Sequence, residues 1–251
     1  MTEISAIIIT FNEERNIGRC IESLLPVMDE IIIIDSFSTD KTKEICSSYP
    51  VKFIENKWLG YSQTKNLGNN LAKFNYIFSI DADEALSKEL QEEILSLKKT
   101  NLNGVYKVNR LTNYCGKWIY HCGWFPDWKI RLFPKEFSKW NNAIVHEELE
   151  FSHSLPENKF QSVLEHYSYY SFAQHQEKAD QYSLLTAKKY FDQKKKSMVF
   201  SPIISAVSRF ISMYFLKLGF LDGSSGFMIA KISAKSNFLK YKELNRLYKQ
   251  N

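Results

Sequence analysis

The first third of the chain alternates short apolar runs with amphipathic segments. The apolar runs are rich in Ile, Val and Phe and are continuous, which predicts buried strands at 4–10, 30–35, 51–55 and 75–80. Between them, apolar residues recur with helical spacing and predict helices at 15–25, 41–48 and 61–71. Buried strands that alternate with helices are typical of a parallel sheet covered on both faces. Ligands of such sheets bind beyond the carboxyl ends of the strands.

After residue 86 the pattern changes. An amphipathic helix is predicted at 87–99, followed by strands of mixed direction at 105–110, 128–134, 143–149 and 161–166. The aromatic loop 113–127 is long for a compact domain, and such loops are usually functional. Helices are predicted at 172–196, 199–220 and 227–249, with a break at Gly223–Gly226. We therefore expect an α/β fold with a mixed sheet flanked by helices over 1–168, and a C-terminal helical region over 169–251.

Composition excludes intrinsic disorder and fibrous repeats. Of the 251 residues, 44% are apolar and 24% are charged, and Gly and Pro are few, at 9 and 6. The four cysteines, Cys20, Cys46, Cys115 and Cys122, show no CxxC spacing, so we expect reduced thiols in a cytoplasmic protein. The first residues lack a basic segment and a small-residue cleavage site, so we expect no signal peptide.

Charge is distributed unevenly along the chain. From Tyr170 onward there are 14 Lys and Arg against 5 Asp and Glu, whereas the preceding residues hold 19 against 23. A basic region of this kind suggests a phosphate-bearing partner, although a solvated helical face is the alternative. Nucleic acid is not expected, because no helix-turn-helix or RNP-like signature is found.

The apolar stretch 199–220 is long enough to span a bilayer, but Pro202, Arg209 and Lys217 interrupt it. This pattern favours an amphipathic helix lying in the plane of an anionic membrane surface. We therefore expect peripheral attachment to the inner face of the cytoplasmic membrane. The alternative is that these helices pack on the main domain or on a second subunit.

Carboxylates follow two of the predicted strands. Asp81-Ala82-Asp83 comes directly after the fourth strand, and a pair spaced in this way can bind a divalent cation that also binds a diphosphate. Asp35 ends the second strand and can accept a hydrogen bond from a base or a ribose, with an Asx turn as the alternative. Asp40 is expected to cap the next helix. We expect Asp35 and Asp83, at the tips of neighbouring strands, to gather round one cation.

Two common phosphate-binding motifs are missing from the sequence. No strand–helix junction carries GxGxxG, and there is no GxxxxGK[ST] loop. The negative charge of a diphosphate must therefore be neutralised in another way, and a cation at Asp83 is the simplest candidate. Lys65 and Asn66 could add a positive charge and an amide, or they could belong to a basic helix face.

Taken in order, the segments TFNEE, DSFSTDKT, QTKNLG and SIDADE resemble the family-two nucleotide-sugar glycosyltransferases. PDWKIRLF, VHEEL and GFLDGSSGF resemble the lipopolysaccharide-core β-glucosyltransferase branch of that family, and the likeness covers nearly the whole chain. It implies a GT-A type, Rossmann-like catalytic domain over 1–168. The QxxRW helix of many relatives is missing, which favours transfer of a single sugar over processive synthesis.

The resemblance also implies roles for donor-site residues. The resemblance places Thr10, Asn12 and Glu13 in the nucleotide pocket. Asp35 would contact the uracil or ribose, and Lys65 is a further candidate for the donor site. Asp81 would hold the nucleotide or the donor sugar, and Asp83 would coordinate Mg²⁺ or Mn²⁺.

An inverting single displacement needs a general base on the acceptor side. Glu147 is the expected base and Asp127 the second choice, while His146 would orient Glu147 or hold the leaving diphosphate. Trp124 is the expected acceptor-stacking residue. The plainer alternatives are a structural His146–Glu147 pair, a turn cap at Asp127 and a core position for Trp124.

The function expected from this pattern is an inverting glycosyltransferase. It would move a hexose, with glucose expected, from UDP-glucose to a lipid-linked saccharide or a lipopolysaccharide core. A nucleotidyltransferase acting on a sugar phosphate is an alternative, disfavoured because the loop after the first strand is acidic. A catalytically inactive membrane scaffold of the same fold is a second alternative, disfavoured because the carboxylates are intact.

Overall fold

The computed structural model describes residues 1–141, 148–195, 198 and 200–250. The chain forms two compact units, each with its own apolar core. Unit 1 comprises Met1–Arg110 and Asp127–Tyr167, and unit 2 comprises Leu111–Pro126 and Ser168–Asn251. The aromatic segment 111–126, which the sequence analysis placed in the main domain, thus groups with the C-terminal helices.

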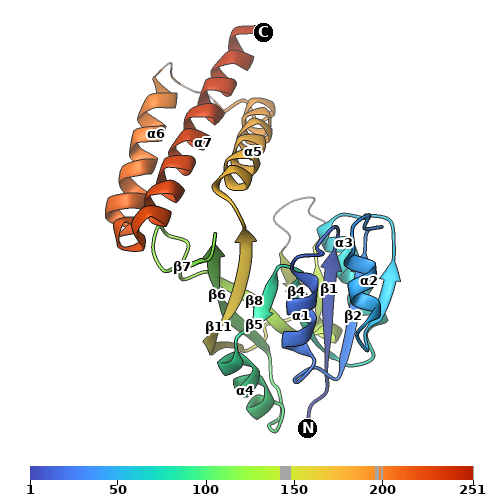
Figure 1. The fold of residues 1–251 in the computed structure, drawn as a ribbon. Helices are drawn as coiled ribbons and strands as arrows, with labels where there is room; N and C mark the ends of the chain where they lie inside the picture. Colours follow the sequence, from blue (N-terminus) through green and yellow to red (C-terminus); the bar gives the residue numbers. More distant parts are fainter. Residues whose placement is uncertain (142–147, 196–197, 199, 251) are drawn as a thin grey trace. The chain divides into compact units, whose positions relative to one another are not determined.

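The N-terminal half of unit 1 is a parallel sheet. Its strands are β1 (Ile4–Thr10), β2 (Glu30–Asp35), β3 (Lys52–Glu55) and β4 (Tyr76–Asp81), in the order β3-β2-β1-β4. The connecting helices are α1 (Ile17–Leu24), α2 (Thr42–Ser47) and α3 (Tyr61–Leu71) (Figure 1). The predicted alternation of strands and helices is therefore confirmed.

Antiparallel strands extend this sheet beyond β4. β8 (Trp128–Pro134) pairs with β4, and the order continues through β6 (Val105–Tyr114), β11 (Glu157–Tyr169) and β5 (Glu84–Leu86). Helix α4 (Lys88–Leu97) follows β5, and a separate hairpin pairs β9 (Ser138–Trp140) with β10 (Leu149–Phe151). The predicted strand 143–149 lies almost wholly outside the described residues. The expected mixed sheet flanked by helices, with a C-terminal helical extension, is confirmed.

Alternate residues of the parallel strands face two different cores. Ala6, Ile8 and Ile33 pack with residues of α1 and α4 on one face of the sheet. Ile7 and Ile9 pack on the other face with residues of α3, β9 and β10. Both faces of these strands are buried, which explains why their sequences are continuous apolar runs.

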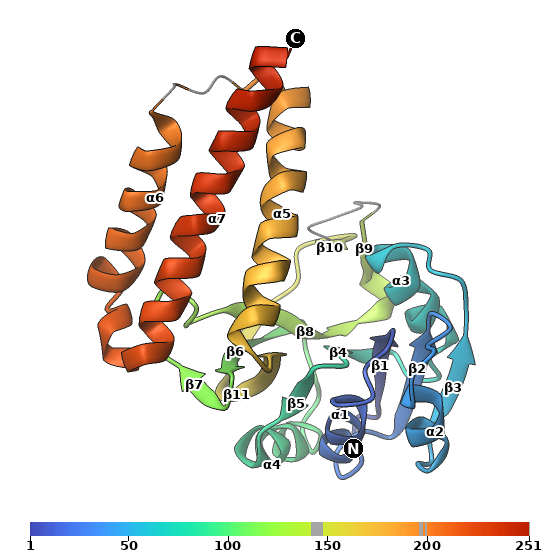
Figure 2. The same ribbon diagram turned by 45° about the horizontal axis from the view of Figure 1, so that its top comes forward.

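Unit 2 is built from helices α5 (Phe172–Asp192), α6 (Ser201–Ile211) and α7 (Gly223–Gln250). In both views α7 lies beside α5 and α6 and packs against each (Figure 2). The end of β6 pairs with β7 (Lys117–Ile119), and Tyr114, Ile119 and Cys122 join the core of these helices.

The expected break at Gly223–Gly226 is wrong. This segment is the first turn of α7, and the chain turns earlier, after a π-helical stretch at Ser212–Leu216, where Leu218 has φ 55°. A short 3₁₀ helix, Gly219–Asp222, leads into α7. Gly226 is small because a Cβ there would overlap the carbonyl oxygen of Gly219.

Candidate functional site

The carboxyl ends of β2, β1 and β4 bring the predicted residues to one edge of the sheet. In the strand register Thr10 pairs with Asp35, and Ile9 pairs with Asp81. Because successive residues of a strand face opposite sides, Asp35 and Asp81 lie on opposite faces of the sheet. β1 also separates their strands. The expectation that the two carboxylate segments follow neighbouring strands is therefore wrong, whereas the convergence of Asp35 and Asp83 on one cation stays a prediction.

Asp35 organises a turn. Its side chain is fully buried, and its two carboxylate oxygens accept hydrogen bonds from the Ser38 backbone N–H at 2.8 Å and the Ser38 hydroxyl at 2.5 Å. These bonds are local, as the turn alternative for Asp35 implies, but the bonded N–H lies three residues on, whereas in an Asx turn it lies two residues on. Further along the loop, Asp40 accepts a hydrogen bond from the Thr42 N–H at 2.9 Å, but the residue that immediately precedes α2 is Lys41, so Asp40 lies one position before the cap that was expected of it.

Asn12 and Glu13 fasten the loop after β1 to the loop after β2. The backbone N–H of Asn12 donates to the Ser38 hydroxyl, and the side-chain amide oxygen of Asn12 accepts from the Thr39 N–H, both at 2.8 Å. The N–H of Glu13 donates to the Thr42 hydroxyl at 2.8 Å. Asn12 has φ 55°, a conformation that Asn tolerates better than most residues. Within the described chain the buried hydroxyl of Thr10 has no hydrogen-bond partner.

Asp81 lies between two buried cations. Its carboxylate is 3.3 Å from Nζ of Lys65 on α3 and 2.8 Å from Nη2 of Arg131 on β8. The side chains of Lys65 and Arg131 are only 4% and 5% exposed. Burial alone would raise the pKa of Asp81, but the two cations outweigh it and hold that pKa well below its ordinary value. Asp81 is therefore a fixed negative charge.

Glu84 contacts both Arg131 and Asp81 and so belongs to the same group of charges. It is fully buried, and one carboxylate oxygen contacts both Arg131 and Nη1 of Arg110, the latter at 3.3 Å. Its other oxygen accepts a hydrogen bond from the Asp81 N–H at 3.1 Å. Arg110 was not predicted from the sequence, because its proximity to Glu84 depends on the pairing of strands far apart in the chain.

Asp83 faces a histidine that the sequence analysis also missed. Nε2 of His166, on β11, is 3.3 Å from Oδ2 of Asp83, and the two side chains are 14% and 27% exposed. The Asp83 carbonyl oxygen accepts from the Tyr167 N–H at 2.8 Å, which fixes the approach of β11. A carboxylate and an imidazole this close, both reachable by solvent, suit a divalent cation.

No three His, Cys, Asp or Glu side chains form a metal-binding group among the described residues. The carboxylate of Asp83 nevertheless fits Mg²⁺ or Mn²⁺, because Mg²⁺ is usually bound through one or two carboxylates together with substrate phosphates and water, and His166 would be a second ligand. The fit thus requires a phosphate-bearing ligand to complete the coordination.

Of the expected acceptor-side residues, the structure describes Asp127 and Trp124. Asp127 is held by Nε and Nη2 of Arg110, at 2.9 and 2.7 Å, and by Nζ of Lys129 at 3.1 Å. Burial alone would raise the pKa of Asp127, but Arg110 and Lys129 outweigh it and lower that pKa, which weakens Asp127 as a base. Glu147 and His146 lie outside the described residues.

Trp124 belongs to unit 2. It packs edge-on against Tyr114 and at a tilt against Tyr169, with ring centroids 5.4 and 6.1 Å apart. These contacts correspond to the core alternative considered for this residue.

Comparison with known proteins places the chain in a family. The family model described as "Glycosyl transferase family 2" matches residues 5–152. An uncharacterized glycosyltransferase of Rickettsia typhi is 32% identical, over 98% of this chain and 88% of that protein. The lipopolysaccharide core biosynthesis glycosyltransferase LpsC of Rhizobium meliloti is 29% identical, over 94% of this chain and 89% of that protein.

Two solved structures are also similar. The Staphylococcus aureus TarS 1–349 complex with UDP aligns with TM-score 0.46 and 13% identity, over 99% of this chain and 92% of that chain. Glucosyl-3-phosphoglycerate synthase of Mycobacterium tuberculosis, in complex with Mn²⁺, UDP and phosphoglyceric acid, aligns with TM-score 0.36 and 20% identity over 46% and 44%. Because the family model covers more than half of the chain, and near full-length relatives are glycosyltransferases, this chain belongs to glycosyl transferase family 2 and is a glycosyltransferase.

Proposed function

We propose that this glycosyltransferase transfers a hexose, glucose, from UDP-glucose to a lipid-linked saccharide or a lipopolysaccharide core. The observation that carries the donor assignment is the group Asp81, Asp83, Lys65, Arg131 and His166 at the carboxyl edge of the sheet. The name of the LpsC relative supports the acceptor class.

The donor site must neutralise a diphosphate. Asp83 and His166 would hold Mg²⁺ or Mn²⁺, and a cation bound there would stabilise negative charge on the departing nucleotide diphosphate. Asp81, held by Lys65 and Arg131, is a rigid acceptor for donor hydroxyl groups. The joined loops that contain Asn12, Glu13 and Ser38 would border the nucleotide.

Transfer would proceed by a single in-line displacement with inversion. An acceptor hydroxyl oxygen forms a bond to C1 of the hexose while the bond from C1 to the phosphate oxygen breaks. The hydroxyl proton passes to the general base, and UDP leaves. Glu147 remains our candidate base, with His146 beside it to orient its carboxylate or hold the diphosphate. Asp127 is the second candidate, disfavoured by its ion pairs with Arg110 and Lys129.

A donor panel tests this function. UDP-glucose, other UDP-hexoses and GDP- and CDP-sugars are each incubated with truncated lipopolysaccharide or lipid-linked acceptor, with Mn²⁺, Mg²⁺ or EDTA. We expect cation-dependent transfer from UDP-glucose. UTP and glucose 1-phosphate are incubated with the protein in a separate reaction. Release of pyrophosphate there, without sugar transfer in the donor panel, would identify a nucleotidyltransferase instead. No turnover of any donor would favour the inactive scaffold.

We further propose that unit 2 binds the anionic inner face of the cytoplasmic membrane. Helix α6, the residue before it and the turn after it carry large apolar side chains, most of them three or four positions apart and each between 45% and 69% exposed: Phe200, Ile203, Ile204, Val207, Ile211 and Phe215. Such a stripe suits an amphipathic helix lying in the lipid interface. The basic excess after Tyr170 complements anionic headgroups, with about 1 kcal/mol for each Lys or Arg near the surface.

No single helix among the described residues is long and apolar enough to span a membrane. Ser201–Leu216 and Gly219–Gln250 have sufficient length and apolarity only when they are taken together, and these two segments meet at a bend of 72°. Flotation with phosphatidylglycerol vesicles tests the proposed membrane contact. Ile204→Glu should abolish flotation, whereas Leu185→Glu, at a 64% exposed position on α5, should leave it intact. Equal flotation of both variants, or none by the parent protein, would contradict the proposal.

A further inference from the structure

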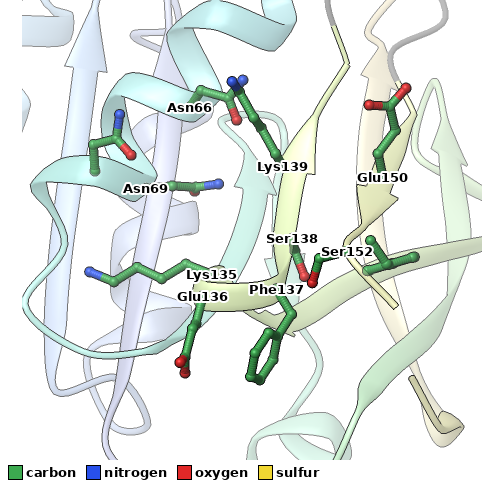
Figure 3. A pocket seen from close by; sticks show the side chains of 11 residues that line it. Asn66, Asn69, Lys135, Glu136, Phe137, Ser138, Lys139, Glu150 and Ser152 are labelled. Carbon is green, nitrogen blue, oxygen red and sulfur yellow. The ribbon is translucent and has the colours of Figure 1, made fainter. Parts of the chain in front are cut away.

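A polar pocket in unit 1 is separate from the residues assigned to the donor. It has a volume of about 690 Å³ and lies between α3 and the β9–β10 hairpin. Figure 3 shows Asn66 and Asn69 of α3 on one side and Ser138, Glu150 and Ser152 of the hairpin segment on the other. A volume in the range of 300 to 1,000 Å³ is typical of small-molecule sites.

One asparagine in this pocket makes no use of its amide. Asn69 is only 4% exposed, yet neither its side-chain oxygen nor its nitrogen has a hydrogen-bond partner among the described residues. The same is true of the hydroxyl of Ser138, across the pocket. Figure 3 shows the Asn69 side chain pointing from α3 toward the hairpin. Buried polar groups are nearly always paired, so these atoms point to an occupant.

Asn66, one turn earlier, provides a contrast. Its amide nitrogen donates to the Trp140 carbonyl oxygen at 2.9 Å, and its amide oxygen accepts from the Trp140 N–H at 3.0 Å. Asn66 thus fastens β9 to α3 and accounts for the local structure. Asn69 adds nothing to that attachment, and its unpaired amide is a cost to folding.

The chemistry of the walls favours a neutral, hydroxyl-rich ligand. The charged lining residues are two lysines and two glutamates, Lys135, Lys139, Glu136 and Glu150, so the pocket has no excess of positive charge for a phosphate. Nζ of Lys135 already donates to the Ala72 carbonyl oxygen at 2.5 Å. Amides and hydroxyls both donate and accept hydrogen bonds, as sugar hydroxyl groups do.

We propose that this pocket binds a neutral saccharide unit, recognised by Asn69 and Ser138. Its place on α3 connects it to the donor-site residues: Asn69 is one helical turn, about 5.4 Å along the axis, from Lys65, which contacts Asp81. Identification of the saccharide as part of the acceptor rests on the proposed function. The binding site itself does not.

Saturation-transfer NMR with methyl β-glucoside, cellobiose, lactose and chitobiose tests the proposal, without donor or metal. We expect a signal from at least one of these sugars, reduced at least tenfold in Asn69→Leu and weakened in Ser138→Ala. Asn101→Leu, at an exposed position that does not line the pocket, should bind as the parent protein does. Asp83→Asn should also retain sugar binding, which separates failure of this site from failure of the donor site.

Thermal unfolding supplies a second readout. If the Asn69 amide serves a ligand, Asn69→Leu should unfold at the same temperature as the parent protein or at a higher one. If the Asn69 amide had a structural role, this variant would instead be less stable than the parent protein. The proposal is overturned if no sugar binds, if Asn69→Leu binds the sugar unchanged, or if a crystal structure soaked with the sugar shows only water beside Asn69.

Discussion

The imidazole of His166 lies 3.3 Å from the carboxylate of Asp83, although the two residues are far apart in the sequence. The contact arises because β11 runs antiparallel to β5, with His166 opposite Glu84 in the register. It converts a single carboxylate after a strand into a pair of potential cation ligands. The proposed role of the cation therefore depends on the sheet order as much as on the Asp81–Asp83 motif.

His166→Asn tests whether this histidine is a cation ligand. We expect the Mn²⁺ concentration needed for half-maximal UDP binding to rise by about 10- to 100-fold, the range measured when partners of metal sites are removed. A Mn²⁺ titration of UDP binding checks this. His153→Asn, at an exposed histidine of the same unit, serves as the control and should leave the titration unchanged. Identical curves for both variants would remove His166 from the site.

Glu84→Gln should destabilise unit 1. The carboxylate of Glu84 neutralises Arg131 and Arg110, and its loss leaves the buried Arg131 to share a single carboxylate, Asp81, with Lys65. Breaking a buried pair in this way typically costs about 3 to 5 kcal/mol. Urea denaturation measures the change, and Glu89→Gln, exposed on α4, should shift stability by no more than about 0.5 kcal/mol. A matching small shift for Glu84→Gln would show that the arginines are held by other groups.

Unit 2 should lose stability in mild acid because of His175. Its Nδ1 is 2.8 Å from the Tyr114 hydroxyl, and burial, with Lys178 nearby, lowers the pKa of His175 from 6.5 to about 4. The unfolded chain therefore binds more protons than the folded chain between these values, and stability falls as pH decreases through this window.

The loss attributable to His175 is about 2 kcal/mol at pH 5 relative to pH 7.5. Unfolding of the parent protein and of His175→Gln at the two pH values measures it. The variant should show a smaller decrease. An equal pH dependence in the two proteins would mean that other groups cause the acid sensitivity.

Gly226→Ala should weaken the packing of α7 on the preceding turn. The new methyl group would overlap the backbone carbonyl of Gly219, which cannot rotate away as a side chain can. Overpacking of this kind costs about 1 to 3 kcal/mol. Gly18→Ala on α1 is the control, since its methyl group would lie 3.6 Å from Ile45 in ordinary contact. Calorimetric melting should rank Gly226→Ala well below Gly18→Ala, and the reverse order would contradict the described close approach.

The sequence predicted best what depends on local pattern. Continuous Ile runs such as 7–9 and 31–34 identify strands buried on both faces, and the helix Tyr61–Leu71 follows from its periodicity. The Asp81–Asp83 segment was found because a buried strand ends there. These features require no knowledge of which distant strands are paired.

Features that depend on tertiary pairing were missed or misread. Arg110 and His166 reach Glu84 and Asp83 only through the order β8-β6-β11-β5. The expectation that Asp35 and Asp83 follow neighbouring strands was wrong, because the position of β1 between β2 and β4 depends on the strand order and not on the local pattern. The segment Gly223–Gly226 was interpreted as a break, because small residues that allow close helix packing have the same composition as a turn.

The central claim is that Asp83 takes part in cation-dependent binding of a nucleotide diphosphate. Calorimetric titration of UDP, with Mn²⁺ and with EDTA, tests it in the parent protein, in Asp83→Asn and in Asp192→Asn, an exposed control on α5. We predict that Mn²⁺ tightens UDP binding at least tenfold in the parent and in Asp192→Asn, and has no effect in Asp83→Asn. UDP binding that is equally tight with and without Mn²⁺ in all three proteins would contradict the account.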